Sequence, residues 1–168
     1  MKVGDAFVCM QGEAFIAKAL EQGAACVLID GAAAEKLDVD ILQLAGEKLV
    51  VIPSLANELP NIAKAHYFRE GLSLPKIIGV TGTNGKSSVV AFIAQIFAAV
   101  GVKSATIGTL GLAVAGSDEI DTGLTTPDIL TNYRFIAECA KQGVKVVAME
   151  VSSHGLSQGR VEGITFDS

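Results

Sequence analysis

The sequence predicts an α/β protein with a small N-terminal α/β domain, residues 1–72, followed by the start of a parallel-sheet domain, residues 76–168. Half of the 168 residues are apolar and only 18% are charged, which suits strands that are covered on both faces. Short apolar runs of strand length alternate with longer runs that have helical spacing. Such alternation implies parallel strands joined by right-handed crossovers.

The N-terminal domain contains three apolar runs of strand length, at residues 6–10, 25–29 and 49–52. A run with helical spacing covers 14–22 and ends at Gly23. A second helix is expected within 55–68, and Pro60 leaves its first residue open, because proline is tolerated only in the first turn. Residues 71–75 are predicted to be a linker.

The second domain repeats a pattern of strand, loop and helix. Apolar runs predict strands at 76–81, 104–109 and 145–151, and a helix that continues from the loop after the first strand to Val100. Residues 111–123 are expected to form an exposed loop or hairpin. A further helix is predicted to start with Thr126 as its cap, Pro127 at its first position and Asp128 beside its positive end, and to end at Gly143.

The most specific pattern is Gly82-Thr83-Asn84-Gly85-Lys86-Ser87, between an apolar strand and a long helix. Glycines allow a tight turn whose N–H groups point at phosphate oxygens, beside the positive end of the helix. Lys86 can reach the β- and γ-phosphates, and the Ser87 hydroxyl can join the ligands of Mg²⁺. The loop is a variant, because Val80 occupies the first glycine position of the strict motif. An ordinary turn with an exposed lysine is the alternative, and the strand–helix setting argues against it.

Glu150 follows the apolar run 146–149, at the expected carboxyl end of a strand. Ligands bind at this edge of open parallel sheets, and a carboxylate there can hold Mg²⁺ directly or through water. A solvated glutamate at a strand end is the alternative. His154 comes soon after, and the residues alone leave open a proton carrier, a neighbour of the metal or a loop residue.

Several other classes are disfavoured by the sequence. A dinucleotide site needs G-x-G-x-x-G and an acid after the next strand, and neither is present here. The net charge of −5 argues against nucleic-acid binding. The three cysteines form no CxxC pair, no signal peptide is evident, and the longest apolar run, 89–100, is too short to span a bilayer. We therefore expect a cytoplasmic protein with reduced thiols and no membrane insertion, and a monomer.

Four stretches together resemble the Mur ligases. They are Gly79-Val80-Thr81-Gly82-Thr83-Asn84-Gly85-Lys86-Ser87, Leu124-Thr125-Thr126-Pro127, Glu150-Val151-Ser152-Ser153-His154-Gly155-Leu156 and Gln158-Gly159-Arg160. The match is nearest to the MurE type, which adds the third residue of the peptidoglycan stem peptide. The phosphate loop is shared with folylpolyglutamate synthetases, whereas the second and third stretches are more specific. Residues 4–8 and 23–25 also resemble the first domain of the family, a domain that binds the nucleotide sugar.

The resemblance implies a role for each matching residue. ATP would be bound by Gly82, Thr83, Asn84, Gly85, Lys86, Ser87 and Ser88. The muramoyl-dipeptide substrate would be held by Thr125, Thr126, Ser152, Gln158 and Arg160. Ser87 and Glu150 would bind Mg²⁺, and Lys86, Glu150 and His154 would form the catalytic set. Such an enzyme phosphorylates a peptide carboxylate with ATP, and the amine of an amino acid then attacks the acyl phosphate.

Three departures from the family pattern affect these expectations. The loop after Met10 is shortened, which weakens the case for uridine contacts, and Pro60 falls inside a family helix. The remainder of the ATPase domain and the C-terminal domain that selects the amino acid, lysine or meso-diaminopimelate, would lie beyond Ser168, so we expect the chain alone to be inactive. The alternatives are another Mur ligase, a folylpolyglutamate synthetase, or a nucleotide-binding module without catalysis.

Overall fold

The computed structural model describes residues 2–10, 14–115 and 120–168. It has mixed α/β structure and divides into two compact units, Met1–Leu59 and Pro60–Ser168. The division falls within one helix, earlier than the predicted linker at 71–75, and our domain bounds of 1–72 and 76–168 remain predictions. The shortened loop noted after Met10 lies at 11–13, outside the described residues.

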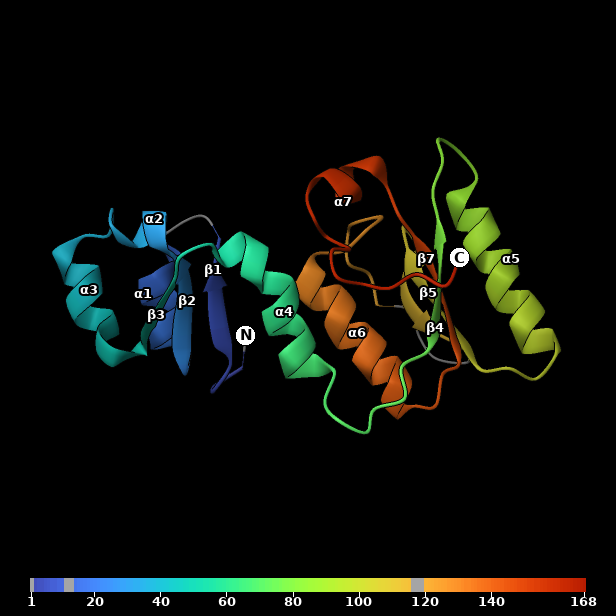
Figure 1. The fold of residues 1–168 in the computed structure, drawn as a ribbon, viewed down its shortest axis with the longest axis horizontal. Helices are drawn as coiled ribbons and strands as arrows, with labels where there is room; N and C mark the ends of the chain where they lie inside the picture. The colour runs from blue at the N-terminus through green and yellow to red at the C-terminus, as the bar shows by residue number, and fades with distance from the viewer. Residues whose placement is uncertain (1, 11–13, 116–119) are drawn as a thin grey trace. The chain divides into compact units, whose positions relative to one another are not determined.

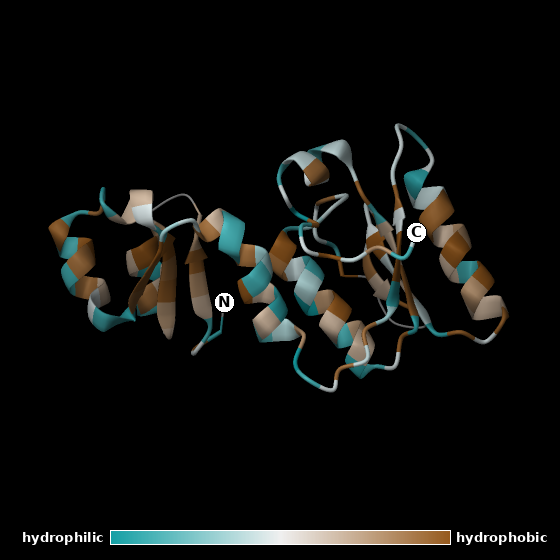
Figure 2. Ribbon diagram, in the orientation of Figure 1, coloured by the Kyte–Doolittle hydropathy of each residue, from teal (hydrophilic) through white to brown (hydrophobic). Residues whose placement is uncertain are grey.

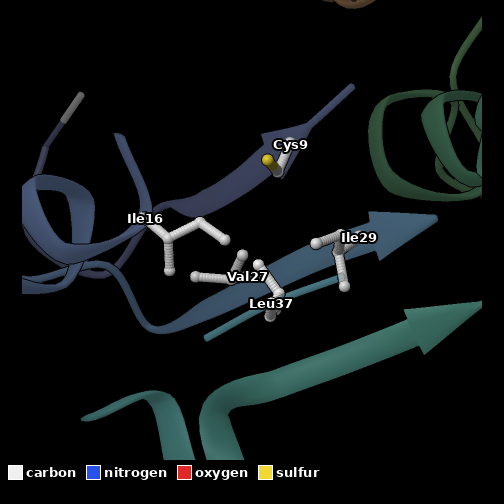
Figure 3. Close-up of a cluster of buried hydrophobic side chains, with 5 residues drawn as sticks. All are labelled: Cys9, Ile16, Val27, Ile29 and Leu37. Carbon is white, nitrogen blue, oxygen red and sulfur yellow. The ribbon is translucent and has the colours of Figure 1, made fainter. Parts of the chain in front are cut away.

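The first unit is built on a three-stranded parallel sheet in the order β1-β2-β3 (Figure 1). Its strands are β1 (Ala6–Cys9), β2 (Cys26–Asp30) and β3 (Leu49–Ile52), close to the predicted ranges. Helix α1 (Phe15–Glu21) also matches its prediction. The core of the first unit contains five buried side chains, shown in Figure 3: Cys9, Ile16, Val27, Ile29 and Leu37.

Three short helical segments between β2 and β3 were missed in the sequence: α2 (Gly31–Ala34), α3 (Val39–Ala45) and the 3₁₀ helix η1 (Gly46–Lys48). Helix α2 starts where the Asp30 carboxylate accepts the Ala32 N–H at 3.0 Å, a contact that apolar periodicity does not reveal. Helix α4 (Leu55–Tyr67) begins at Leu55, so Pro60 lies inside the helix, beyond its first turn. Proline at this depth removes the hydrogen bond to the Ala56 carbonyl.

The second unit contains a four-stranded sheet in the order β4-β7-β5-β6. Strands β4 (Lys76–Val80), β7 (Val146–Glu150) and β5 (Ser104–Gly108) are parallel, as predicted, and β6 (Gly111–Val114) forms an antiparallel hairpin with β5. The expectation that this hairpin is exposed was wrong for β6, because Leu112 and Val114 are buried in the sheet. Helix α5 (Lys86–Ala99) packs on β5 and β7, and α6 (Ile129–Lys141) lies on the other side of the sheet (Figure 1). The short helix α7 (Ser153–Ser157) occupies a stretch for which the sequence suggested no helix.

Helix α5 is apolar on both its inner and its outer face (Figure 2). Val90 is buried against the sheet. Four large apolar side chains on the helix remain substantially exposed: Val89, Phe92, Ile96 and Val100. No helix in the described part of the chain has the length and apolar character needed to cross a membrane.

The last residues of the chain run along β4. The Asp167 N–H donates to the Ile77 carbonyl and the Gly79 N–H donates to the Ser168 carbonyl, both at 2.8 Å. The Phe166 ring lies so close to Gly79 that a Cβ there would approach the ring to 2.8 Å. Position 79 therefore has no room for a side chain in this packing.

The predicted cap of α6 was wrong by two residues. Helix α6 begins at Ile129, and Asp128 is its N-cap. The Asp128 carboxylate accepts hydrogen bonds from the Thr131 N–H at 3.0 Å and the Thr131 hydroxyl at 2.6 Å. Thr126 lies outside the helix because its hydroxyl is bonded to the segment that follows β7.

Replacing Asp128 by alanine is expected to destabilise the second unit by about 1 kcal/mol, because it leaves the Thr131 N–H in the first turn without its acceptor. Urea unfolding of the 168-residue chain, followed by circular dichroism, measures the change. Asp128→Asn is the control, since asparagine is also a good N-cap and should keep most of the stability. Equal losses in the two variants would contradict the assignment of the cap.

Cys139 is buried within α6, and its burial raises the pKa of the thiol from 9.0 to about 12. The negative charge of Glu138 adds a smaller increase, and the positive charge of Lys103 lowers the pKa slightly. The neutral thiol therefore stabilises the folded state below pH 9, and this contribution is lost as the pH rises from 9 toward 12. At pH 9 we expect iodoacetamide to modify Cys139 at least ~100-fold more slowly than the partly exposed Cys26. Mass spectrometry of digested protein measures both rates. Comparable rates in folded protein would contradict the prediction, and urea-unfolded protein is the control.

Candidate functional site

The loop that the sequence predicts to bind phosphate connects β4 to α5. Gly82 and Gly85 have φ angles of +142° and +81°, a region that residues with a side chain rarely adopt. Gly85 is the N-cap of α5, and the loop residues from Thr81 to Gly85 are exposed. The 14-residue helix thus presents its positive end and its first N–H groups to the loop. This is the backbone arrangement that a phosphate group requires.

Lys86 is the first residue of α5, and its side chain turns back over the loop. Its Nζ donates a hydrogen bond to the Gly82 carbonyl at 2.8 Å. Ser87 is half-buried at the next position, and Ser88 is exposed. The ammonium group therefore already lies against the loop whose N–H groups would bind phosphate.

Glu150 ends β7, the strand beside β4. In the parallel register it pairs with Val80, and the Val151 N–H donates to the Val80 carbonyl at 2.8 Å. Val80 is the residue that leads into the phosphate-binding loop. The pairing of β4 with β7 therefore brings Glu150 and the loop to the same edge of the sheet, as the sequence predicted.

The Glu150 side chain is not the solvated strand-end carboxylate that we considered as the alternative, because it is only 2% exposed. Its Oε1 accepts the Thr109 N–H at 2.9 Å, and its Oε2 accepts the Thr109 hydroxyl at 3.3 Å. Gly108, at the end of β5, lies directly against the carboxylate, and a Cβ on it would collide with Oε1. The carboxylate is thus held by the end of the neighbouring strand.

Thr126 connects the Thr-Thr-Pro stretch to the segment after β7. It is fully buried, and its hydroxyl donates to the Glu150 carbonyl at 3.0 Å and accepts the Ser152 N–H at 3.0 Å. The Ser152 hydroxyl lies 3.1 Å from the same oxygen and accepts the Gly155 N–H at 3.0 Å, which caps α7. A Cβ on Gly155 would approach the Thr126 side chain to 2.8 Å. Contact of the Thr126 hydroxyl with a substrate would require displacing these partners.

Arg160 is joined to the same stretch. Its Nη1 donates to the Thr126 carbonyl at 2.7 Å, and the side chain is half-buried. The Asn132 amide, fully buried in α6, donates to the carbonyls of Pro127 and Arg160 at 3.0 and 2.9 Å. The structure therefore brings Thr125, Thr126, Ser152 and Arg160 together at the end of the sheet.

The remaining predicted residues lie on the surface nearby. His154 is exposed on α7, and its carbonyl accepts the Ser157 hydroxyl at 3.0 Å. Gln158, the C-cap of α7, is also exposed. The geometry gives neither side chain a defined partner in the site, so their roles remain predictions.

Sequence reasoning missed Gly108, Thr109 and Asn132. Gly108 and Thr109 could have been found, because the rule that led to Glu150 applies equally to the carboxyl end of β5. Asn132 carries no such signal, since a polar residue in a helix is usually exposed. Its burial became evident only from the packing of α6.

Comparisons with known proteins identify the relatives of this chain. Residues 80–168 match the model of the Mur ligase middle domain. The chain is 37% identical, over 98% of its length, to a UDP-N-acetylmuramoyl-L-alanyl-D-glutamate--2,6-diaminopimelate ligase of Xanthomonas oryzae, of which it covers 32%. It is 42% identical, over 97% of its length, to the protein of the same name in Chromobacterium violaceum, of which it covers 33%. The chain thus spans about a third of the length of the curated relatives it matches.

Two solved structures share the fold. A UDP-N-acetylmuramoyl-L-alanyl-D-glutamate--2,6-diaminopimelate ligase superimposes with a TM-score of 0.74 and 26% identity, covering 99% of this chain and 33% of that one. The MurF ligase of Thermotoga maritima in complex with ADP gives a TM-score of 0.53 at 16% identity, covering 91% of this chain and 30% of that one. At that identity the second likeness concerns the fold alone.

Proposed function

Because residues 80–168 match the middle domain of the Mur ligases, the chain belongs to that family, and we propose that it is part of an ATP-dependent ligase of peptidoglycan precursor synthesis. The enzyme would add the third amino acid to UDP-N-acetylmuramoyl-L-alanyl-D-glutamate and would act in the cytoplasm. Lysine and meso-diaminopimelate are the two candidates, and the names of the relatives favour the second. The observation that carries this proposal is the pairing of Val80 with Glu150, which joins a phosphate-binding loop to a buried carboxylate.

We assign ATP to residues 82–88, with Lys86 on the phosphates. In the first step a substrate carboxylate oxygen attacks the γ-phosphorus, and ADP leaves. In the second step the amine attacks the acyl phosphate and releases inorganic phosphate. Two anions must meet in the first step, so a lysine at the loop and the positive end of α5 lower the cost of bringing them together.

The residues present fit a magnesium ion. Each oxygen of the Glu150 carboxylate accepts one hydrogen bond from Thr109, so each retains electron pairs for a cation. A carboxylate and the Ser87 hydroxyl are hard oxygen ligands, and Mg²⁺ bound to nucleotide phosphates commonly needs only one or two carboxylates. The ion would neutralise phosphate charge during transfer.

We assign the muramoyl-dipeptide to Thr125, Ser152, Gln158 and Arg160, with Thr126 as the buried support of this surface. The Arg160 guanidinium uses Nη1 for the Thr126 carbonyl, and its planar fork has further N–H groups for a carboxylate or a phosphate. His154 remains a candidate for proton transfer. Residues 1–72 would be the domain that binds the UDP-sugar, and 76–168 the first part of the ATPase domain.

The full-length protein should release phosphate from ATP only when UDP-N-acetylmuramoyl-L-alanyl-D-glutamate and the correct amino acid are both present. A screen of amino acids, scored by ADP formation, identifies the third residue. Turnover with a folate polyglutamylation substrate, or without any acceptor, would contradict the proposal. Calorimetric titration of ATP·Mg²⁺ into the 168-residue chain tests separately whether this part alone is a nucleotide-binding module.

A further inference from the structure

Thr109 follows directly after β5 and directs both of its hydrogen-bond donors at Glu150. The backbone N–H reaches Oε1 at 2.9 Å and the hydroxyl reaches Oε2 at 3.3 Å. The backbone N–H holds one oxygen of the carboxylate, and the rotation of the group is fixed as well whenever the hydroxyl donates to the other oxygen. A Cβ at the preceding residue, Gly108, would collide with the same carboxylate. The end of β5 is therefore shaped around this one side chain.

The Thr109 hydroxyl also donates to the Thr125 hydroxyl, at 3.0 Å. A hydroxyl has a single hydrogen, so it can serve Glu150 or Thr125 at any moment but not both. Glu150 would hold a divalent cation through the free electron pairs of its oxygens, and the Thr109 hydroxyl would then donate to Thr125 instead of Glu150. Thr125, having gained a donor, becomes a stronger donor toward an anionic group of a substrate.

We propose that Thr109 is a positioning residue whose hydroxyl holds the Glu150 carboxylate in place before a divalent cation binds and donates to Thr125 afterwards, which couples the cation to Thr125. The inference rests on the proposed function, because it takes Glu150 as a metal ligand and Thr125 as a substrate contact. It makes a distinct claim, which concerns the hydroxyl of a residue to which the proposed function assigns no role. Cation and dipeptide should each strengthen the binding of the other.

The test measures Mn²⁺ binding to the full-length protein in the presence of ADP, by the loss of the free Mn²⁺ signal in electron paramagnetic resonance. Thr109→Val removes the hydroxyl and keeps both the shape and the backbone N–H, and we expect it to weaken Mn²⁺ binding about 5-fold. Thr109→Ser restores the hydroxyl and should bind within about twofold of the native protein. Thr106→Val is the matched control, since it makes the same change at a half-buried position of β5, the strand that Thr109 follows.

The coupling is measured as the ratio of dipeptide dissociation constants with EDTA and with saturating Mn²⁺. We expect a ratio of about 3 or more in the native protein and in Thr109→Ser, and a ratio near 1 in Thr109→Val. Native-like Mn²⁺ binding and coupling in Thr109→Val, or equal losses in the serine and valine variants, would overturn the inference.

Two further outcomes have defined meanings. If circular dichroism shows that Thr109→Val does not fold, Thr109→Ala makes the same test with a smaller side chain. If the native protein neither binds Mn²⁺ with ADP nor turns over, the proposed function fails and this inference fails with it. Native turnover together with an unaffected valine variant refutes the inference alone.

Discussion

Replacing Lys86 by methionine should lower the rate of ATP-dependent phosphate release by the full-length protein by roughly 10³-fold, the scale seen when one electrostatic contact to a transition state is lost. The loss should fall mainly on kcat, because the ammonium group meets the charge that develops as the γ-phosphoryl group moves. Methionine keeps the length and the apolar stem of the side chain, so the packing at the start of α5 should persist. Initial rates at saturating ATP, dipeptide and amino acid measure the effect.

Lys103→Met is the matched control for this variant. Lys103 belongs to the same unit, and its Nζ also donates to a backbone carbonyl, that of Gln142, at 3.0 Å. It lies just before β5, at the opposite end of the sheet from the loop, and its replacement should leave kcat within about twofold. Equal rate losses in the two variants would show that removing a positive charge, and not the loop position, is responsible.

Replacing Gly108 by alanine is expected to destabilise the 168-residue chain by about 1–3 kcal/mol, because the added methyl group must displace the buried Glu150 carboxylate. The interaction with Glu150 can be isolated by a double-mutant cycle. In a Glu150→Ala background the same glycine replacement should cost less than about 0.5 kcal/mol. Urea unfolding of the four proteins measures both numbers.

Gly79→Ala is the control for this cycle. A Cβ at Gly79 would meet the Phe166 ring and not Glu150, so its cost should be the same in the native and Glu150→Ala backgrounds. If the cost of Gly108→Ala also stayed the same in both backgrounds, the contact with Glu150 would not explain the absence of a side chain at position 108.

The part of the fold that could be predicted is the part set by local pattern. Short apolar runs marked every strand of the two sheets except β6, which the sequence placed in a loop or hairpin. The Gly82–Lys86 loop marked the start of α5. Helices α2 and α3 could not be found in this way. Helix α2 has four residues and depends on a cap from Asp30, whose other carboxylate oxygen accepts the Leu55 N–H from a distant segment.

The predictable part of the candidate site is the set of residues at the carboxyl ends of the parallel strands, because these ends meet at one edge of the sheet. Glu150 was placed there by its position after an apolar run. The state of its side chain was not predictable, because the carboxylate is held by Thr109 and lies against Gly108, a glycine 42 positions earlier in the sequence. Thr126 was misplaced as a helix cap for a related reason: threonine, proline and aspartate in succession suit two caps, and only tertiary contacts select Asp128.

The bonds around Thr126 affect how substitutions in this region should be interpreted. Ser152, Gly155 and Arg160 all follow β7 in the sequence, and each contacts Thr126, which comes from the stretch before α6. Effects of single changes at these positions should not sum, because the first change already releases the others. If alanine were substituted at each of the four positions separately, the sum of the four effects would exceed the effect of changing all four together.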